Sequence, residues 1–171
     1  DMSRNDQSIT RRSLEPTVDS RKNAEPSGVI RFELGLDQNF ETHRSEKVQI
    51  EGLPWNVYVK KSNLAPSFEY LSLFVTCNPN SSTMWSCRAS IEIGIIKANG
   101  ERYEKLIFSW NFNNKVDDVG FHAFLSWNFM MDPQKNFIRD GKVTIEARIF
   151  VEETTGVRTT VLLFRTTAWA P

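Results

Sequence analysis

The chain has 171 residues, and its content of 40% hydrophobic and 12% aromatic residues suffices to bury the core of one domain, which excludes global disorder. Its 21 basic residues balance its 21 acidic residues, so no positive excess favours a nucleic-acid partner. No apolar run approaches the roughly 20 residues that span a bilayer, so we expect no membrane partner either.

Along the chain the composition predicts three parts. Residues 1–28 are polar and charged without a hydrophobic period, and we expect a disordered N-terminal tail or linker there. Residues 29–155 carry a regular apolar pattern and are expected to form the folded domain. Residues 156–171 form a C-terminal extension, for which an edge strand and a linker both remain open.

The folded part is predicted to be β-structure, because apolar residues recur at every second position and so point to one face of each strand. Such runs occupy residues 30–34, 48–50, 55–59, 71–77, 87–95, 106–112 and 143–151. Turn residues separate the runs, and Asn99-Gly100 predicts a hairpin, since both residues tolerate positive φ. We therefore predict an all-β fold, an antiparallel β-sandwich of about eight strands.

Two runs carry more specific expectations. Trp55 shares a face with Val57 and Val59 and is expected in the core. The sixth run places four apolar residues on one predicted core face: Leu106, Phe108, Trp110 and Phe112.

One segment departs from the two-residue period. Phe121, Phe124 and Leu125 are spaced at i, i+3 and i+4 after Asp117-Asp118. This spacing predicts one short helix that ends before Asp132.

The two cysteines lie at the ends of two predicted strands, on either side of a turn rich in Pro, Asn and Ser. Cys77 and Cys87 both fall at core positions by alternation, which favours reduced thiols, although a cross-strand disulfide is geometrically open. With reduced thiols we expect a location in the cytoplasm, the nucleus or both.

Residue types that carry catalysis are present but are not grouped. His43 and His122 are far apart in sequence, and no pair of cysteines or histidines has the spacing of a zinc site. Asp117 and Asp118 are adjacent and therefore diverge on a strand or a helix, where a paired-carboxylate centre needs convergence. No glycine-rich phosphate loop occurs. We expect no enzymatic activity, no metal site and no cofactor.

Aromatic residues also occur on a face that is predicted to point away from the core. In the run that ends at Cys77 this face carries Tyr70, Ser72, Phe74 and Thr76. Two large aromatic side chains need a cover, either from a loop or the partner sheet, or from a ligand strand added to an exposed sheet edge.

Four segments, in chain order, resemble the meprin and TRAF homology (MATH) domain over roughly residues 29–153. They are residues 48–57 (VQIEGLPWNV), residues 70–75 (YLSLFV), residues 118–124 (DVGFHAF), and residues 128–145 with NFMMD and FIRDGKVTI. The resemblance implies a non-catalytic sandwich that binds a short extended peptide of a partner protein in a shallow groove.

In members that carry a BTB domain, the resemblance implies substrate recognition for a cullin-RING ubiquitin ligase, through a BTB domain outside this chain. Three alternatives stay open: a self-associating scaffold, a TRAF-like signalling adaptor, and the targeting domain of a larger deubiquitinase or protease.

The matched motifs also imply a peptide groove. Its expected residues are Phe74, Trp110, Asp118, Val119, Phe121 and His122, with Tyr70, Ile91 and Asp117 as further candidates. For Ile91, alternation equally predicts the core. Val119 stands where BTB-linked members carry tryptophan, which disfavours their Ser/Thr-rich ligands, and the two aspartates favour a basic or neutral peptide.

Overall fold

The computed structural model describes residues 24–157. Its strands are β1 (Gly28–Gly35), β2 (Thr42–Arg44), β3 (Val48–Ile50), β4 (Leu53–Ala65), β5 (Phe68–Cys77), β6 (Ser86–Ile96), β7 (Arg102–Asn113), β8 (Asp118–Ser126), β9 (Ile138–Arg139) and β10 (Lys142–Thr155). Between β8 and β9 lie the helix α2 (Trp127–Met131) and the 3₁₀ turn η2 (Pro133–Lys135).

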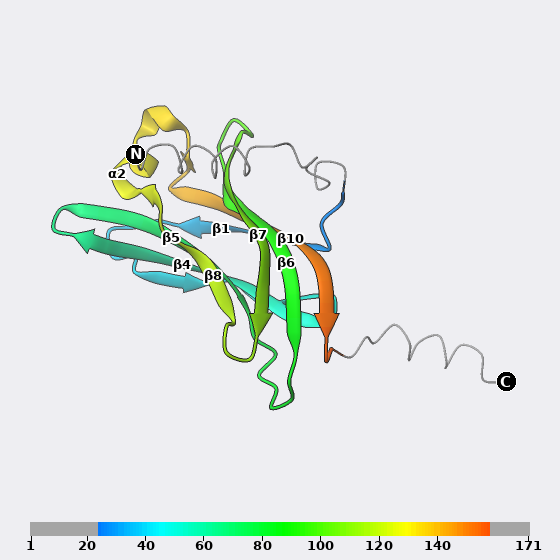
Figure 1. Ribbon diagram of the computed structural model, residues 1–171. Coiled ribbons are helices and arrows are strands. Elements are labelled where there is room, and N and C mark those ends of the chain that lie inside the picture. Colours follow the sequence, from blue (N-terminus) through cyan, green and yellow to red (C-terminus); the bar gives the residue numbers. More distant parts are fainter. Residues whose placement is uncertain (1–23, 158–171) are drawn as a thin grey trace, which may run out of the picture.

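The strands form two antiparallel sheets that pack face to face (Figure 1). Sheet A has the order β1-β10-β6-β7, with β9 paired to β10, and sheet B has the order β2-β4-β5-β8, with β3 paired to β4. The predicted antiparallel β-sandwich is confirmed. β7 and β8 each lie at an edge of their sheet, which becomes important for the candidate site.

The core between the sheets consists of the apolar residues that alternation predicted. Residues without exposed surface include Leu71, Leu73, Val75, Ala89, Ile93, Val143, Ile145, Ala147 and Ile149. Trp55 is buried as predicted: its Nε1 donates a hydrogen bond to the Ile50 carbonyl (3.2 Å), and its ring packs edge-on against Phe112 at 5.0 Å.

The predicted hairpin at Asn99-Gly100 joins β6 to β7. Gly100 adopts the positive φ (89°) that the turn requires. Asn99 contributes differently, because its side-chain oxygen accepts a hydrogen bond from the Glu101 backbone N–H (3.0 Å). Both residue types serve the turn, but only the glycine uses the left-handed region.

The predicted helix was placed wrongly. Phe121, Phe124 and Leu125 belong to β8, and the helix begins after them, at Trp127. Leu73 pairs with Phe121 and Leu71 pairs with Leu125, so β8 advances four residues where β5 advances two. This bulge, and not a helical turn, produces the spacing of i, i+3 and i+4.

The predicted core face of residues 106–112 is wrong for its first half. Leu106 is 45% and Phe108 is 71% exposed, whereas Ile107 between them is buried. Ser109 has a φ of 45°, and β7 advances three residues (Ile107 to Trp110) where β6 advances two. The bulge at Ser109 shifts the alternation, so that beyond it Trp110 and Phe112 face inward as predicted, although only Phe112 is buried.

The cysteines are not paired with each other, and the folded domain begins slightly before residue 29. Cys77 and Cys87 are free and buried. Ser27 and Gly28, within the predicted tail, already contribute to sheet A: the Ser27 N–H donates to the Ile149 carbonyl (2.8 Å), and Gly28 begins β1. Residues 1–23 of the predicted tail lie outside the described residues. So do residues 158–171, which hold most of the C-terminal extension.

Candidate functional site

The two edge strands β7 and β8 lie next to each other on one side of the sandwich (Figure 1). Lys105 of β7 connects them: its Nζ lies 5.4 Å from the ring centre of Phe121 and 5.1 Å from that of Phe124, both on β8. Tyr103 of β7 packs edge-on against Phe124 at 5.7 Å. We call the surface formed by Lys105, Trp110, Val119 and Phe121 the β7/β8 edge.

β7 presents apolar side chains beside an edge with which no strand among residues 24–157 pairs. An edge strand directs half of its backbone N–H and C=O groups away from its sheet, where another strand can pair with them. Leu106 and Trp110, 45% and 39% exposed, flank these groups on β7. Trp110 pairs with the buried Ala89, so it projects toward sheet B and hence toward β8.

The bulge that turns Trp110 inward is held by a carboxylate. Glu152 of β10 accepts hydrogen bonds from the hydroxyls of Ser109 and Ser90, both at 2.8 Å, and from Arg88 Nε at 3.1 Å. The Ser109 N–H in turn donates to Ser90 Oγ (3.0 Å). Partial burial raises the pKa of Glu152, but the hydrogen bonds from Ser109, Ser90 and Arg88 outweigh that effect, and the net pKa is lowered.

On β8, Val119 and Phe121 form the other wall of the β7/β8 edge. They pair with Val75 and Leu73, which are buried, so they lie on the inner face of sheet B. Both are half-buried because β8 is the last strand of its sheet and no further strand of the described residues covers them. One part of each side chain therefore packs against the core, and another part stays exposed to solvent.

Phe74 and His122 lie on the opposite, outer face of sheet B. Their rings pack edge-on at 4.9 Å, and Phe74 also contacts Tyr58 at 6.2 Å. Arg44 stacks on Tyr58 with its Cζ 4.2 Å from the ring centre. These four residues form an outer aromatic row across the sheet, which supplies much of the cover that Phe74 needs.

Gly120 makes the outer aromatic row possible. Phe74 pairs with Gly120, and a Cβ on residue 120 would lie 2.6 Å from the Phe74 Cα and 2.8 Å from its Cδ1, as well as against the Leu73 carbonyl oxygen. Only glycine allows the Phe74 ring this close approach.

The remaining predicted residues are separated. The Asp117 carboxylate accepts a hydrogen bond from Asn78 Nδ2 (3.0 Å), while Asp118 is exposed at the start of β8. Tyr70 is half-buried near the other end of β5, opposite Ser126. Ile91 has no exposed surface and belongs to the core, the alternative that alternation favoured.

Lys105 and Leu106 are site residues that sequence reasoning missed. The predicted core face of residues 106–112 assigned Lys105 outward, so its position over the β8 rings was not expected. Nothing in the unbroken alternation of Leu106, Phe108, Trp110 and Phe112 signals the bulge at Ser109.

Two groups that can carry chemistry, metal ligands and thiols, are arranged as follows in the described residues. Among residues 24–157, no group of three or more His, Cys, Asp or Glu side chains could hold a metal ion. Burial raises the pKa of Cys87 to about 12, and it also raises the pKa of Cys77, so both stay protonated thiols near neutral pH. No helix within this part of the chain has the length and apolarity needed to cross a membrane.

Comparisons with known proteins agree with this fold. A family model for the MATH domain matches residues 36–151. The chain is 31% identical over 143 residues to the BTB and MATH domain-containing protein 38 of Caenorhabditis elegans, covering 79% of this chain and 36% of that protein. The chain is also 26% identical over 146 residues to the BTB and MATH domain-containing protein 36 of Caenorhabditis elegans, covering 79% of this chain and 44% of that protein.

A third relative is named as a hydrolase and not as a BTB and MATH domain-containing protein. The chain is 27% identical over 116 residues to the ubiquitin carboxyl-terminal hydrolase 7 of Drosophila melanogaster, covering 66% of this chain and 10% of that protein. The chain therefore spans less than half the length of each of these relatives.

Proposed function

Because the chain belongs to the MATH domain family and is a protein-interaction domain, we propose that it binds an extended peptide of a partner protein along the β7/β8 edge. The observation that carries the proposal is the edge of β7, which no strand of the described part of the chain covers. Exposed Leu106 and Trp110 flank it, and Phe121 of β8 faces it. A peptide strand would pair with the β7 backbone and place alternate side chains against these apolar groups.

The charges along the edge favour a particular ligand. Asp118 is exposed at the start of β8, and Lys105 lies farther along, over the rings of Phe121 and Phe124. A neutral or basic peptide avoids repulsion at Asp118, and its apolar residues fill the space beside Val119. Since valine is smaller than tryptophan, this space accepts a bulkier apolar side chain than the Ser/Thr-rich ligands of BTB-linked members provide.

At the level of the whole protein, we infer a non-catalytic substrate adaptor for a cullin-RING ubiquitin ligase. Support comes from the relatives whose names pair a MATH domain with a BTB domain. A partner of that kind would place the protein in the cytoplasm or the nucleus.

The relative named as a ubiquitin carboxyl-terminal hydrolase favours a second candidate, the targeting domain of a larger deubiquitinase. The coding sequence that flanks these residues separates the two candidates: a BTB domain supports the adaptor, and a hydrolase domain supports the alternative.

The peptide-binding proposal is tested with a peptide selected from a displayed library against the full chain. We expect Phe121→Ala and Trp110→Ala to weaken its binding by about 1–3 kcal/mol, the usual range for an aromatic anchor, with little change in melting temperature. Phe68→Ala is the matched control, because Phe68 is 59% exposed at the start of β5, in the β4–β5 hairpin.

Two further variants refine the test. Phe74→Ala weakens binding only if the peptide extends onto the outer aromatic row, and Val119→Trp should reduce affinity for a ligand with a bulky apolar residue. Equal loss of binding in Phe68→Ala and Phe121→Ala, or a large fall in melting temperature for both Phe121→Ala and Trp110→Ala, would contradict the β7/β8 edge as the binding surface.

A further inference from the structure

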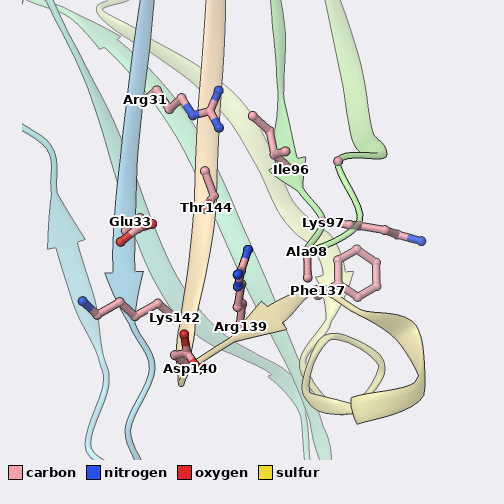
Figure 2. Close-up of a pocket in the computed structure, with 11 residues that line it drawn as sticks. Arg31, Glu33, Ile96, Lys97, Ala98, Phe137, Arg139, Asp140, Lys142 and Thr144 are labelled. Carbon is pink, nitrogen blue, oxygen red and sulfur yellow. The ribbon is translucent and has the colours of Figure 1, made fainter.

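A second surface with the character of a binding site lies on the outer face of sheet A, away from β7. A hollow of about 500 Å³ opens there above β1 and β10, beside the β9–β10 hairpin (Figure 2). In the strand order β1-β10-β6-β7, β6 separates its floor from the edge strand β7.

The lining of the hollow is positively charged. Four basic and two acidic residues leave a net charge of +2 on the lining, although the chain as a whole is neutral. These residues are Arg31, Lys97, Arg139, Lys142, Glu33 and Asp140. Lys97 also lies 3.7 Å from Glu101, which is not part of the lining, so the uncompensated charge is between +1 and +2. The hollow therefore complements an anionic ligand.

The β9–β10 hairpin places two of these cationic residues directly opposite each other. Its two-residue turn, Asp140-Gly141, has positive φ at both positions (53° and 73°), as a type I′ turn requires. The turn pairs Arg139 directly with Lys142, and like charges in directly opposite positions are unfavourable. Within residues 24–157, neither side chain has a carboxylate within salt-bridge distance. A bound anion would relieve this repulsion.

Arg31 supplies a second guanidinium from β1. Its only carboxylate partner in the described part of the chain is Glu146, at 3.6 Å. Glu146 already accepts shorter hydrogen bonds from Arg102 (2.6 Å) and Arg148 (3.1 Å), so its charge is compensated without Arg31. Arg31 is 58% exposed and can turn to a ligand without leaving Glu146 unpaired.

Figure 2 shows how these groups are arranged. The Arg31 side chain extends toward β10, and the Arg139 side chain lies alongside β10. Thr144, on β10, lies between these two side chains. Lys142 points the other way, toward β1, as repulsion from Arg139 would favour. Guanidinium and hydroxyl groups are donors that suit the acceptor oxygens of a phosphate group.

We propose that Arg31, Arg139 and Thr144 bind the phosphate of a phosphorylated side chain in a partner polypeptide. A phosphate monoester carries about −1.5 to −2 charges at neutral pH, which matches the lining. The hollow is open and floored by the flat face of a sheet, whereas small free ligands are usually enclosed over most of their surface. Ala98 and Ile96 form an apolar wall that suits the residues beside the phosphorylated one.

The test uses the full chain and a degenerate, fluorescently labelled peptide library with a fixed central phosphoserine, followed by anisotropy. We expect saturable binding that the unphosphorylated library lacks. Arg139→Ala and Arg31→Ala should each weaken it by about tenfold or more, since hydrogen bonds to charged groups contribute about 1.5–3 kcal/mol. Arg139→Lys should recover only part of the affinity, because lysine cannot form the bidentate contact.

Lys47→Ala is the control, since Lys47 is exposed, lies outside the hollow and removes the same charge. Phe121→Ala should leave phosphopeptide binding unchanged, which separates this site from the β7/β8 edge. Absence of saturable binding would overturn the proposal, and so would an equal loss in Lys47→Ala. The assignment to a polypeptide would also be overturned if phosphoinositide-containing vesicles bound in an Arg139-dependent manner while the library did not.

Discussion

Glu152 is the residue on which the shape of β7 most depends. Its carboxylate joins three strands, because it is part of β10 and accepts hydrogen bonds from Ser90 of β6 and Ser109 of β7. The bulge at Ser109 places Trp110 on the inner face. A charge on one strand thus positions an aromatic side chain two strands away.

The lowered pKa of Glu152 predicts a pH dependence. Because the folded-state pKa lies below the unfolded-state value, its stabilising contribution is present above the unfolded-state value and is lost as the pH falls through the folded-state value. We therefore expect Glu152→Gln to lower stability at neutral pH and to flatten the loss of stability between neutral pH and pH 3. Urea unfolding at a series of pH values measures this.

Glu104 provides a control, because its pKa is shifted in the opposite direction to that of Glu152. Burial, and next the charge of Glu92, raise its pKa, so its ionised form is penalised in the folded state and this penalty shrinks as the pH falls. Glu104→Gln should therefore make the loss of stability toward acid steeper. If Glu152→Gln and Glu104→Gln change the loss of stability toward acid pH in the same direction, the hydrogen bonds to Glu152 do not lower its pKa.

At the scale of elements, close backbone contact fixes the pairing of β6 with β7. Gly94 pairs with Glu104, and a Cβ at residue 94 would lie 2.6 Å from the Glu104 Cα and against the Tyr103 carbonyl oxygen. We expect Gly94→Ala to force the strands apart and to destabilise the fold by about 1–3 kcal/mol, the usual cost of overpacking.

Gly35→Ala is the matched control for this substitution. A Cβ at Gly35 meets nothing within 4 Å, and its φ is not in the left-handed region, so little change in stability is expected. Thermal and urea unfolding of both variants make the comparison. A Gly94→Ala variant as stable as Gly35→Ala would show that β7 can shift away from β6 without cost.

The elements also show where sequence reasoning succeeds and where it fails. Strands that carry no extra residue of their own, such as β5 from Leu71 to Cys77, follow the two-residue period, and their buried faces were predicted correctly. The errors fall on β7 and β8, where bulges change which residues face inward. A bulge depends on the partner strand and on side chains such as Glu152, which lie far away in sequence.

The same distinction holds for the candidate site. The motif resemblance singled out Val119 and Phe121, which the structure brings to one edge, but it could not separate them from Phe74 on the outer face. That separation depends on the pairing of Phe74 with Gly120 and of Leu73 with Phe121. Lys105 was missed for the same reason, because its face depends on the register of β7.

For the molecule as a whole, the N-terminal boundary of the domain can be located by truncation. Removing residues 1–23 should change the free energy of unfolding by less than about 1 kcal/mol. Removing residues 1–28 also deletes two hydrogen bonds of Ser27, from its N–H to the Ile149 carbonyl and from the Val151 N–H to its hydroxyl. At about 0.5–1.5 kcal/mol each, they should make the shorter chain measurably less stable.

Chemical denaturation of the two truncated chains and the full chain measures the difference. Equal stability of both truncated chains would place the functional start of the domain after Gly28. A large loss on removal of residues 1–23 alone would mean that the folded unit extends further toward the N-terminus.

The bulge at Ser109 has a consequence for how β7 behaves in a crowded solution. An exposed strand edge with apolar side chains invites pairing with identical chains, which leads toward fibrous aggregates. The bulge divides the edge into two short stretches, residues 102–107 and 110–113, and twists them relative to each other. A short guest strand needs only one of these stretches, whereas a second copy of β7 would need both in register. The irregularity thus protects the protein from its own copies while it leaves the edge open to a short partner.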